Sequence, residues 1–213
     1  MNDLLRLLAA RQPVFGSIID VGASNASWTR AARQFYPHGR CLLIEAQPVH
    51  EPSLIEYCHQ HPDTHYVLAA AGAAPGELYF DTADPQGGQA SYTPFARHNL
   101  VVPVTTIDAE VERLWLPGPF LLKLDTHGFE VPILQGAART LPAVAAIVME
   151  CYNFRIAPEG LLFHEMCARL ADDGFRCLDL ADVLHRPYDG VFWQMDLAFV
   201  RHDPTIYDYV HYH

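Results

Sequence analysis

Lysine and arginine are scarce in this sequence. There are 14 basic residues against 25 acidic ones, which gives a formal net charge of −11 at pH 7. Proteins neutralise nucleic-acid phosphates with clustered lysine and arginine, and no run of five basic residues occurs here. The composition therefore argues against a tRNA, rRNA or DNA substrate, and we expect no nucleic-acid partner.

Signals for membrane insertion, secretion and disulfide formation are also missing. No apolar run reaches the length that crosses a bilayer. The N-terminal stretch spreads Asp3, Arg6 and Arg11 among its apolar residues, which leaves no uninterrupted apolar core of a signal peptide. The five cysteines form no C-x-x-C pair, and three of them lie in apolar runs, which is typical of buried free thiols. These absences favour a cytoplasmic protein without membrane contact.

The apolar content is high enough for one well-packed domain. Half of the 213 residues are hydrophobic, and no long repeat or linker interrupts the chain. We predict a single domain over residues 1–213. Leucines within residues 1–13 predict a short amphipathic helix that covers one edge of a sheet.

The stretch that organises the chain begins at Ser17. Residues 17–21 are a short, branched apolar run typical of a buried strand, and the small residues Gly22, Ala23 and Ser24 follow at once. A helical pattern starts near Ser27, so the stretch reads as the first half of a nucleotide-binding βα unit. The G-x-G-x-x-G fingerprint is absent, because Gly22 is its only glycine, and an ordinary strand-to-helix turn remains the alternative.

Two further strands are predicted to reach the same edge of the sheet. Residues 41–46 form an apolar run that ends in an acid, Glu45, which in a doubly wound sheet binds the ribose hydroxyls of a nucleotide. A solvated strand end is the alternative for Glu45. Residues 65–72 predict a third strand that runs into small residues, among them Ala70, where an adenine ring can lie.

Titratable residues follow the two strands predicted at 119–125 and 145–150. Asp125 ends the first of them and His127 follows two residues later, while Glu150 ends the second, two residues before Tyr152. Ligand chemistry in open α/β sheets collects outside the carboxyl ends of the strands. We therefore expect all four side chains in one crevice, with Glu150 and Tyr152 holding substrate hydroxyls.

The remaining elements are read from periodicity and from glycine and proline signals. Residues 81–99 are polar and rich in glycine, proline and glutamine, which predicts a mobile substrate loop, with disorder as the alternative. Helices are expected over residues 52–61, 109–114, 130–134 and 158–174, and strands over residues 77–80, 101–104, 175–180 and 191–200.

Taken together, these motifs resemble the FkbM-type SAM-dependent methyltransferases. IIDVGASNASWT is similar to the family's first motif, IDVGANxGxxT, and LLIEAQP is similar to its acidic second-strand motif. LLKLDTHGFEVPILQGA is the most specific match, to LKIDVEGxExxVLxGA. IVMECYNF, the segment Phe163–Glu165 and WQMDLAFVR resemble the closing third, so the likeness runs from Ile18 to Arg201.

The resemblance implies an α/β class I methyltransferase (Rossmann-like) fold, with a largely parallel seven-stranded sheet, helices on both faces and an antiparallel last strand. It implies S-adenosylmethionine as cofactor and O-methylation of a hydroxyl on a sugar or another small molecule. It places Asp20 and Gly22 at the methionine and ribose end of the cofactor, Glu45 on the ribose hydroxyls and Asp125 beside the methyl group. The expected cofactor-binding residues are thus Asp20, Gly22, Ala23, Ser24, Glu45, Ala70 and Asp125.

Two positions depart from the family motifs. Ala26 replaces the usual last glycine of the first loop, and His127 stands where Glu or Gln is usual. An alcohol nucleophile must lose its proton near the transition state, and histidine is the common base at neutral pH. We therefore predict that His127, or else a neighbouring acid, accepts this proton while Asp125 orients the site. A helix cap or packing contact is the alternative for His127.

Other functions and ligands remain open at this stage. Asp125, Glu150 and Asp196 could together bind Mg²⁺ or Ca²⁺, but acids gather at strand ends without metal, and we expect none. A catalytically silent SAM-binding module is the main alternative function, and an NAD-binding oxidoreductase is a weaker one. The expected partner is a hydroxyl acceptor, with a second copy of the chain as a further candidate. The aromatic tail 207–213 is predicted to be a plain chain terminus, and subunit pairing or closure over a site are the alternatives.

Overall fold

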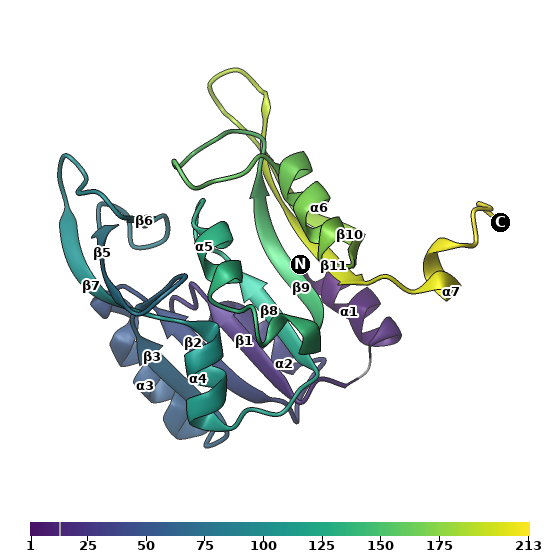
Figure 1. Ribbon diagram of the computed structural model, residues 1–213, viewed down its shortest axis with the longest axis horizontal. Coiled ribbons are helices and arrows are strands. Elements are labelled where there is room, and N and C mark those ends of the chain that lie inside the picture. Colours follow the sequence, from purple (N-terminus) through teal and green to yellow (C-terminus); the bar gives the residue numbers. More distant parts are fainter. Residues whose placement is uncertain (13) are drawn as a thin grey trace.

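The computed structural model describes residues 1–12 and 14–213, and a seven-stranded sheet lies at its centre (Figure 1). The strands of this sheet are β1 (Ser17–Val21), β2 (Arg40–Glu45), β3 (Thr64–Leu68), β8 (Phe120–Leu124), β9 (Val144–Tyr152), β10 (Phe175–His185) and β11 (Phe192–Arg201). Their spatial order is β10-β11-β9-β8-β1-β2-β3. Only β11 runs against its two neighbours, β9 and β10. The predicted largely parallel sheet with a reversed last strand is therefore confirmed.

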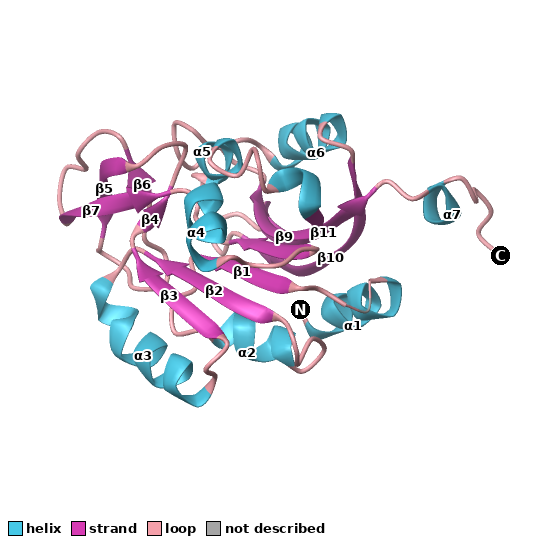
Figure 2. Cartoon of the chain, turned by 60° about the horizontal axis from the view of Figure 1, so that its bottom comes forward, coloured by secondary structure: helices cyan, strands magenta, loops and turns pink. Residues whose placement is uncertain are grey.

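Helices cover both faces of the sheet, as predicted (Figure 2). One face carries α1 (Asn2–Arg11), α2 (Ser27–Arg33) and α3 (Glu51–Gln60), and the other carries α4 (Ile107–Leu114), α5 (Glu130–Gln135) and α6 (Phe163–Asp172). Side chains alternate along a strand, so in β1 Ile18 packs under α1 and α2 while Ile19 packs under the opposite layer. Within the part of the chain that the structure describes, no helix is long and apolar enough to cross a membrane.

A second, four-stranded sheet was not anticipated. It contains β4 (Ala70–Ala71), β7 (Asn99–Thr105), β5 (Gly76–Asp81) and β6 (Ala90–Ser91), in that spatial order. The predicted strand over residues 65–72 is wrong in its second half, because the chain changes partners there. Leu68 still pairs with Glu45 of β2, whereas Ala70 pairs with Val104 of β7. The small residues thus leave the main sheet beside the end of β2.

The N-terminal helix was predicted to cover one edge of the sheet, and this prediction is wrong: the helix lies on a face of the main sheet. Leu4, Leu5 and Leu8 are buried in one apolar cluster with residues of β1, β8, β9 and β11, such as Val148. Three leucines on one stripe bury more area over the broad face of a sheet than along an edge strand. Residue 13, the last of the predicted 1–13 segment, lies outside the described residues.

Helix boundaries follow local hydrogen bonds. The Thr106 hydroxyl accepts the N–H of Ala109 at 3.1 Å, so α4 starts just after Thr106. Helix α6 starts at Phe163, five residues later than predicted, because Glu165 accepts the N–H of Leu162 at 2.8 Å and closes the first turn there. Gly174, with φ +83°, follows its last turn, as expected.

Two 3₁₀ turns, η1 (Pro48–His50) and η2 (Leu141–Ala143), and a short C-terminal helix complete the chain. Helix α7 (Pro204–Tyr207) follows β11, and the tail leaves the body of the protein beyond it (Figure 1). Because β11 is reversed, it delivers the tail to the edge of the sheet opposite the carboxyl ends of the parallel strands. Closure of the tail over a site at those ends is therefore wrong.

Candidate active site

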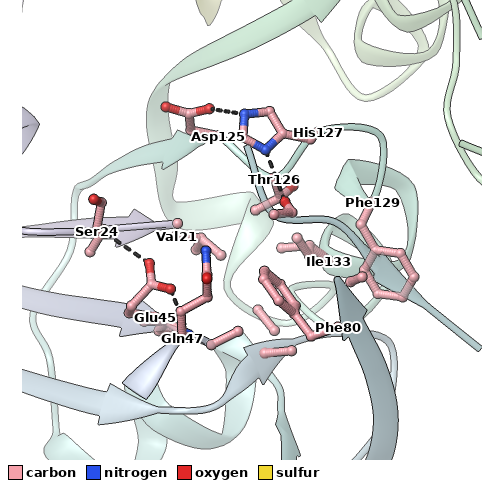
Figure 3. A pocket seen from close by; sticks show the side chains of 18 of the residues that line it. Val21, Ser24, Glu45, Gln47, Phe80, Asp125, Thr126, His127, Phe129 and Ile133 are labelled. Carbon is pink, nitrogen blue, oxygen red and sulfur yellow. Dashed lines mark hydrogen bonds and ion pairs between the residues drawn. The ribbon is translucent and has the colours of Figure 1, made fainter. Parts of the chain in front are cut away.

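A cavity opens at the carboxyl ends of β1, β2 and β8 (Figure 3). Six of the seven predicted cofactor-binding residues line it: Gly22, Ala23, Ser24, Glu45, Ala70 and Asp125. Apolar side chains, among them Phe80, Phe129 and Ile133, form another part of its wall. The structure thus brings together an acid, a turn of small residues and an apolar wall that contains aromatic side chains.

Gly22 allows the three strand ends to approach one another. Its φ is +74°, and a Cβ there would lie 2.0 Å from the backbone oxygen of Asp125. Its N–H donates to the carbonyl of Ile44 in β2 at 2.9 Å. A side chain at this position would therefore push β8 away from β1.

The Glu45 carboxylate joins two loops at the cavity wall. Its Oε2 accepts the N–H of Ser24 at 2.8 Å, and its Oε1 accepts the N–H of Gln47 at 2.7 Å (Figure 3). These two hydrogen bonds hold the side chain in one orientation, and only 5% of the residue is exposed. A carboxylate offers about four lone pairs, so two remain for hydroxyl groups in the cavity.

Asp20, the seventh predicted residue, does not line the cavity. It is fully buried, accepts a hydrogen bond from the Thr29 hydroxyl at 2.6 Å and lies 3.5 Å from Nζ of Lys123. Strand alternation points it toward the α1–α2 face, below the loop that forms the cavity. Asp20 thus lies beneath the cavity, where it contacts Thr29 and Lys123. It is not among the residues that form the cavity surface, where the predicted cofactor contact would lie.

Lys123 is a site residue that the sequence reasoning missed. Its Nζ donates to Oδ2 of Asp125 at 3.0 Å and to the carbonyl of Gly22 at 3.3 Å, and the residue is only 4% exposed. Burial lowers the pKa of Lys123, but the charges of Asp20 and Asp125 outweigh it and raise the pKa above its usual value. A lysine inside the apolar run of residues 119–124 was the available signal, since buried lysines are paired.

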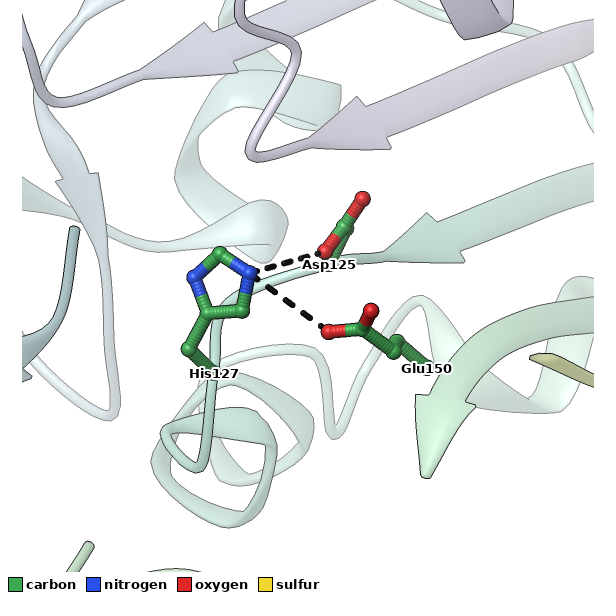
Figure 4. Close-up of side chains that lie close together, drawn as sticks. All are labelled: Asp125, His127 and Glu150. Atoms are coloured by element: carbon green, nitrogen blue, oxygen red, sulfur yellow. Dashed lines mark ion pairs between the residues drawn. The ribbon is translucent and has the colours of Figure 1, made fainter. Parts of the chain in front are cut away.

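Asp125, His127 and Glu150 meet beside this cavity, and we name them the Asp–His–Glu group (Figure 4). Nε2 of His127 lies 3.4 Å from Oδ1 of Asp125 and 3.5 Å from Oε2 of Glu150. The predicted meeting of these residues is therefore present in the structure. The short connection between β8 and α5 brings His127 back over the end of its own strand.

This connection is a strained turn with its own support. His127 has φ +52° and Gly128 has φ +98°. The buried carboxylate of Glu130 accepts the N–H of Gly128 at 3.0 Å and the hydroxyl of Thr126 at 3.1 Å. These bonds offset the cost of about 1 kcal/mol for a left-handed non-glycine residue.

The second ring nitrogen of His127 fixes the tautomer. Nδ1 lies 3.0 Å from the backbone oxygen of Gly88, which can only accept, so Nδ1 carries a proton. In the neutral imidazole, Nε2 then has a free lone pair, and it is this atom that faces Asp125 and Glu150.

Glu150 is held by two donors and titrates near neutrality. The Tyr152 hydroxyl donates to its Oε2, and Nε2 of Gln194 donates to its Oε1. Burial and the charge of Asp125 raise the pKa of Glu150 to about 7. Burial also raises the pKa of Asp125, but the charges of Lys123 and His127 outweigh burial. The pKa of Asp125 is therefore below its usual value. The group therefore pairs an ionised acid with one that is half protonated at neutral pH.

A second hollow lies on the far side of His127 and Glu150. Its walls include Tyr152, Phe154 and Trp193, whose rings form edge and tilted pairs with centroids 5.0–5.9 Å apart. Residues 84–90, inside the predicted 81–99 substrate loop, line both this hollow and the cavity. Phe154 and Trp193 were not predicted as site residues, because nothing in their local sequence marks strand-end aromatics as ligand-facing.

The loop is tied to the site at both of its sides. Nε2 of Gln47 and Nε2 of His50 lie 3.0 Å and 2.8 Å from the carbonyl oxygen of Pro85. On the other side, Gln89 donates to the carbonyl of His127 at 3.3 Å. His127 therefore stands where the cavity, the loop and the second hollow meet.

Solved structures with a similar fold include several class I methyltransferases. A methyltransferase FkbM from Methylobacillus flagellatus KT is 14% identical with a TM-score of 0.54, and the match covers 85% of this chain but 43% of that protein, so this chain spans less than half its length. Streptococcus pneumoniae Sp1610, a putative tRNA (m1A22) methyltransferase, is 15% identical with a TM-score of 0.52 over 94% of this chain and 70% of that one. A Burkholderia thailandensis 1,6-didemethyltoxoflavin-N1-methyltransferase, solved with S-adenosylhomocysteine, is 12% identical with a TM-score of 0.52 over 94% and 77%. At such identities the likeness shows the fold alone, which confirms the predicted class I methyltransferase fold.

The sequence itself carries the family assignment. No curated protein has a significantly similar sequence. The profile of the methyltransferase FkbM domain, however, matches residues 20–177, which span β1 to the start of β10 and include the whole Asp–His–Glu group. The chain therefore belongs to the FkbM methyltransferase family.

Proposed function

We propose that this protein is a SAM-dependent methyltransferase that methylates a hydroxyl group on a small molecule, such as a sugar or a secondary metabolite. The observation that carries the proposal is the meeting of two hollows at His127. One has the features of a nucleotide site, and the other is an aromatic and polar hollow of the kind that binds small molecules.

The first cavity fits S-adenosylmethionine. Glu45 keeps lone pairs free for ribose hydroxyls, and the residues around Ala70 and Phe80 give an apolar wall for adenine. Asp125 lies on the side of the cavity nearest the second hollow. The methionine part of the cofactor would lie beside Asp125. When bound, S-adenosylmethionine supplies a methyl group on a positively charged sulfur, and this charge suits an acidic cavity.

The acceptor hydroxyl is placed in the second hollow, next to the Asp–His–Glu group. Nδ1 of His127 is occupied by Gly88, so Nε2 is the atom that takes the hydroxyl proton when no metal is present. The hydroxyl of Tyr152 and the amide of Gln194 hold Glu150, which orients the acceptor. The loop 84–90 borders both hollows at this point, so it would limit the access of water to a nucleophile aligned with the methyl group.

The replacement His127→Gln tests the role of the imidazole. We expect turnover to fall by about 10²-fold or more, since a positioned base contributes this much, while the affinity for S-adenosylhomocysteine stays unchanged. Turnover is measured with a panel of hydroxylated acceptors, and cofactor affinity by calorimetry. His59→Gln, on the exposed side of α3, is the matched control.

Two results would contradict this function. Unchanged turnover in His127→Gln, with cofactor still bound, would remove His127 from the reaction. Binding of S-adenosylhomocysteine without transfer to any acceptor would instead favour a silent binding module, and binding of NAD alone would favour an oxidoreductase.

A further inference from the structure

Three electron-rich atoms converge in the Asp–His–Glu group. Nε2 of His127, a carboxylate oxygen of Asp125 and a carboxylate oxygen of Glu150 all lie within 4.8 Å of one another (Figure 4). The contacts of 3.4 and 3.5 Å from Nε2 are longer than N–H···O hydrogen bonds, which cluster near 2.9 Å. Nε2 is thus close enough to share a partner with both carboxylates and too far from either of them to form a short hydrogen bond.

The histidine is prepared as a ligand by its outer contact. Because Gly88 accepts the Nδ1 proton, the neutral ring directs its Nε2 lone pair at the two carboxylates. Three lone pairs that face one another require a positive centre between them, either a proton or a cation. A backbone carbonyl on the other ring nitrogen is the usual outer contact of metal-bound histidines.

The two carboxylates are also held from outside the group. Lys123 donates to Oδ2 of Asp125, which leaves Oδ1 facing His127. Tyr152 and Gln194 fix Glu150 from its own strand and from β11. Fixed ligands of this kind lose little entropy when a cation binds.

We infer that Asp125, His127 and Glu150 bind one divalent transition-metal cation such as Mn²⁺. This inference deepens the proposed function and rests on it for the role of the cation. Ligand atoms at right angles around one metal, each bonded at about 2.1–2.4 Å, lie about 3.0–3.4 Å apart, close to the 3.4 and 3.5 Å that separate Nε2 from the two carboxylate oxygens. One imidazole with two carboxylates favours Mn²⁺, Fe²⁺, Co²⁺ or Zn²⁺ over Mg²⁺ and Ca²⁺, which prefer oxygen ligands alone.

This site differs from the oxygen-only one considered from the sequence. Asp196, opposite Glu150 on β11, is not among the three clustered residues, and His127 takes its place. His127 and Glu150 line the second hollow, where the acceptor hydroxyl is proposed to lie, so a cation held by them would be within reach of that hydroxyl. A bound cation would lower the pKa of a hydroxyl coordinated to it, so the hydroxyl would release its proton to solvent in the second hollow more readily, with His127 as a ligand and not as the base.

Binding of Mn²⁺ to the full chain, stripped with a chelator, tests the inference without any acceptor. We expect one Mn²⁺ per chain by calorimetry and by electron paramagnetic resonance. His127→Gln and Glu150→Gln should each weaken binding by about tenfold or more, because each removes one ligand. His59→Gln should bind Mn²⁺ like the unaltered chain, and S-adenosylhomocysteine affinity confirms that every variant is folded.

The outcomes separate the inference from the function. No saturable binding of Mn²⁺, Co²⁺ or Zn²⁺ at about 1 mM, or equal binding by His127→Gln, overturns the metal site. Methyl transfer that persists after chelation would then leave the proposed function intact. One Mn²⁺ bound through His127, with no methyl transfer to any acceptor, would support the site and count against the function.

Discussion

At the residue scale, two small residues of the first loop have different reasons to be small. Ala26 replaces a family glycine and has φ +64°, yet its methyl is fully buried in a cluster with Leu54 and Tyr57. The methyl points toward α3 and does not line the cavity. The departure from the motif therefore leaves the cofactor space open. Gly22 has no such freedom, because a Cβ would meet the backbone of Asp125.

Gly22→Ala should destabilise the protein far more than its backbone angle explains. The left-handed φ alone costs about 1 kcal/mol for alanine, and the clash at 2.0 Å adds to it, so we expect a loss of roughly 3 kcal/mol or more in the free energy of unfolding. Gly190→Ala is a matched control: φ is +73°, and nothing lies within 4 Å of the added Cβ. Urea unfolding of both variants measures the difference, and equal losses would show that the clash is relieved at no cost.

At the scale of elements, Glu45 links the ends of β1 and β2. One oxygen holds the loop after β1 through Ser24, and the other holds the loop after β2 through Gln47. Gln47 in turn reaches the substrate loop at Pro85. The carboxylate that we propose to bind ribose therefore also connects the loops after β1 and β2 and, through Gln47, the substrate loop.

Glu45→Gln should weaken the binding of S-adenosylhomocysteine. An amide group in place of one oxygen turns a donor toward the N–H of Ser24 or Gln47, and it removes an acceptor for a ribose hydroxyl. We expect a loss of affinity of about 10- to 100-fold, measured by calorimetry. Glu77→Gln, exposed on β5, is the control, and an affinity within twofold of the unaltered chain would remove Glu45 from the cofactor site.

The strands β1, β2 and β8 were predictable because each is a short apolar run that ends at a glycine or an acid, whereas β10 contains several charged residues and was predicted only to residue 180. The position of Glu45 and Asp125 at strand ends followed from the same runs. The second sheet was not predictable, since β4 and β6 have two residues each and are defined by their partners. The start of α6 was missed because it depends on one side-chain bond, from Glu165 to Leu162.

Site residues that act through distant partners were also beyond the sequence. The tautomer of His127 is set by Gly88, 39 residues earlier in the chain, and Glu150 is held by Gln194, 44 residues later. Lys123 differs, because its charge inside an apolar strand was visible and called for a partner. A rule that every buried charge is paired would have added Lys123 to the site beside Asp125.

At the scale of the whole molecule, acidic side chains are gathered on the α1–α2 face of the sheet near its carboxyl edge. Glu150 of β9 and Asp196 of β11 are opposite one another in register, and Asp20 of β1 is opposite Lys123 of β8. Nearer the amino ends of the same strands, the α1–α2 face is apolar, for example at Ile18. Buried acids along one edge make the stability of the fold depend on pH.

The stability of the metal-free protein should fall as the pH rises from about 5 to 7.5. Burial and the charge of Asp125 raise the pKa of Glu150 to about 7, and burial and the same charge raise that of Asp196 to about 6. An acid whose pKa is raised on folding is protonated in the native state while it is ionised in the unfolded chain, so stability present at low pH is lost through this window. Asp125, His127 and Tyr152 face Glu150, and Asp196 lies opposite it, so these are the groups that set its titration.

We expect the free energy of unfolding to drop by on the order of 2 kcal/mol across this range, since Glu150 is only 12% exposed. Urea unfolding at several pH values, in the presence of a chelator, measures the slope. Glu150→Gln should flatten it by removing the larger of the two titrations, whereas Glu77→Gln should leave it unchanged. A stability that rises with pH would mean that Glu150 is ionised in the folded protein, and the Asp–His–Glu group would then carry one more negative charge than we describe.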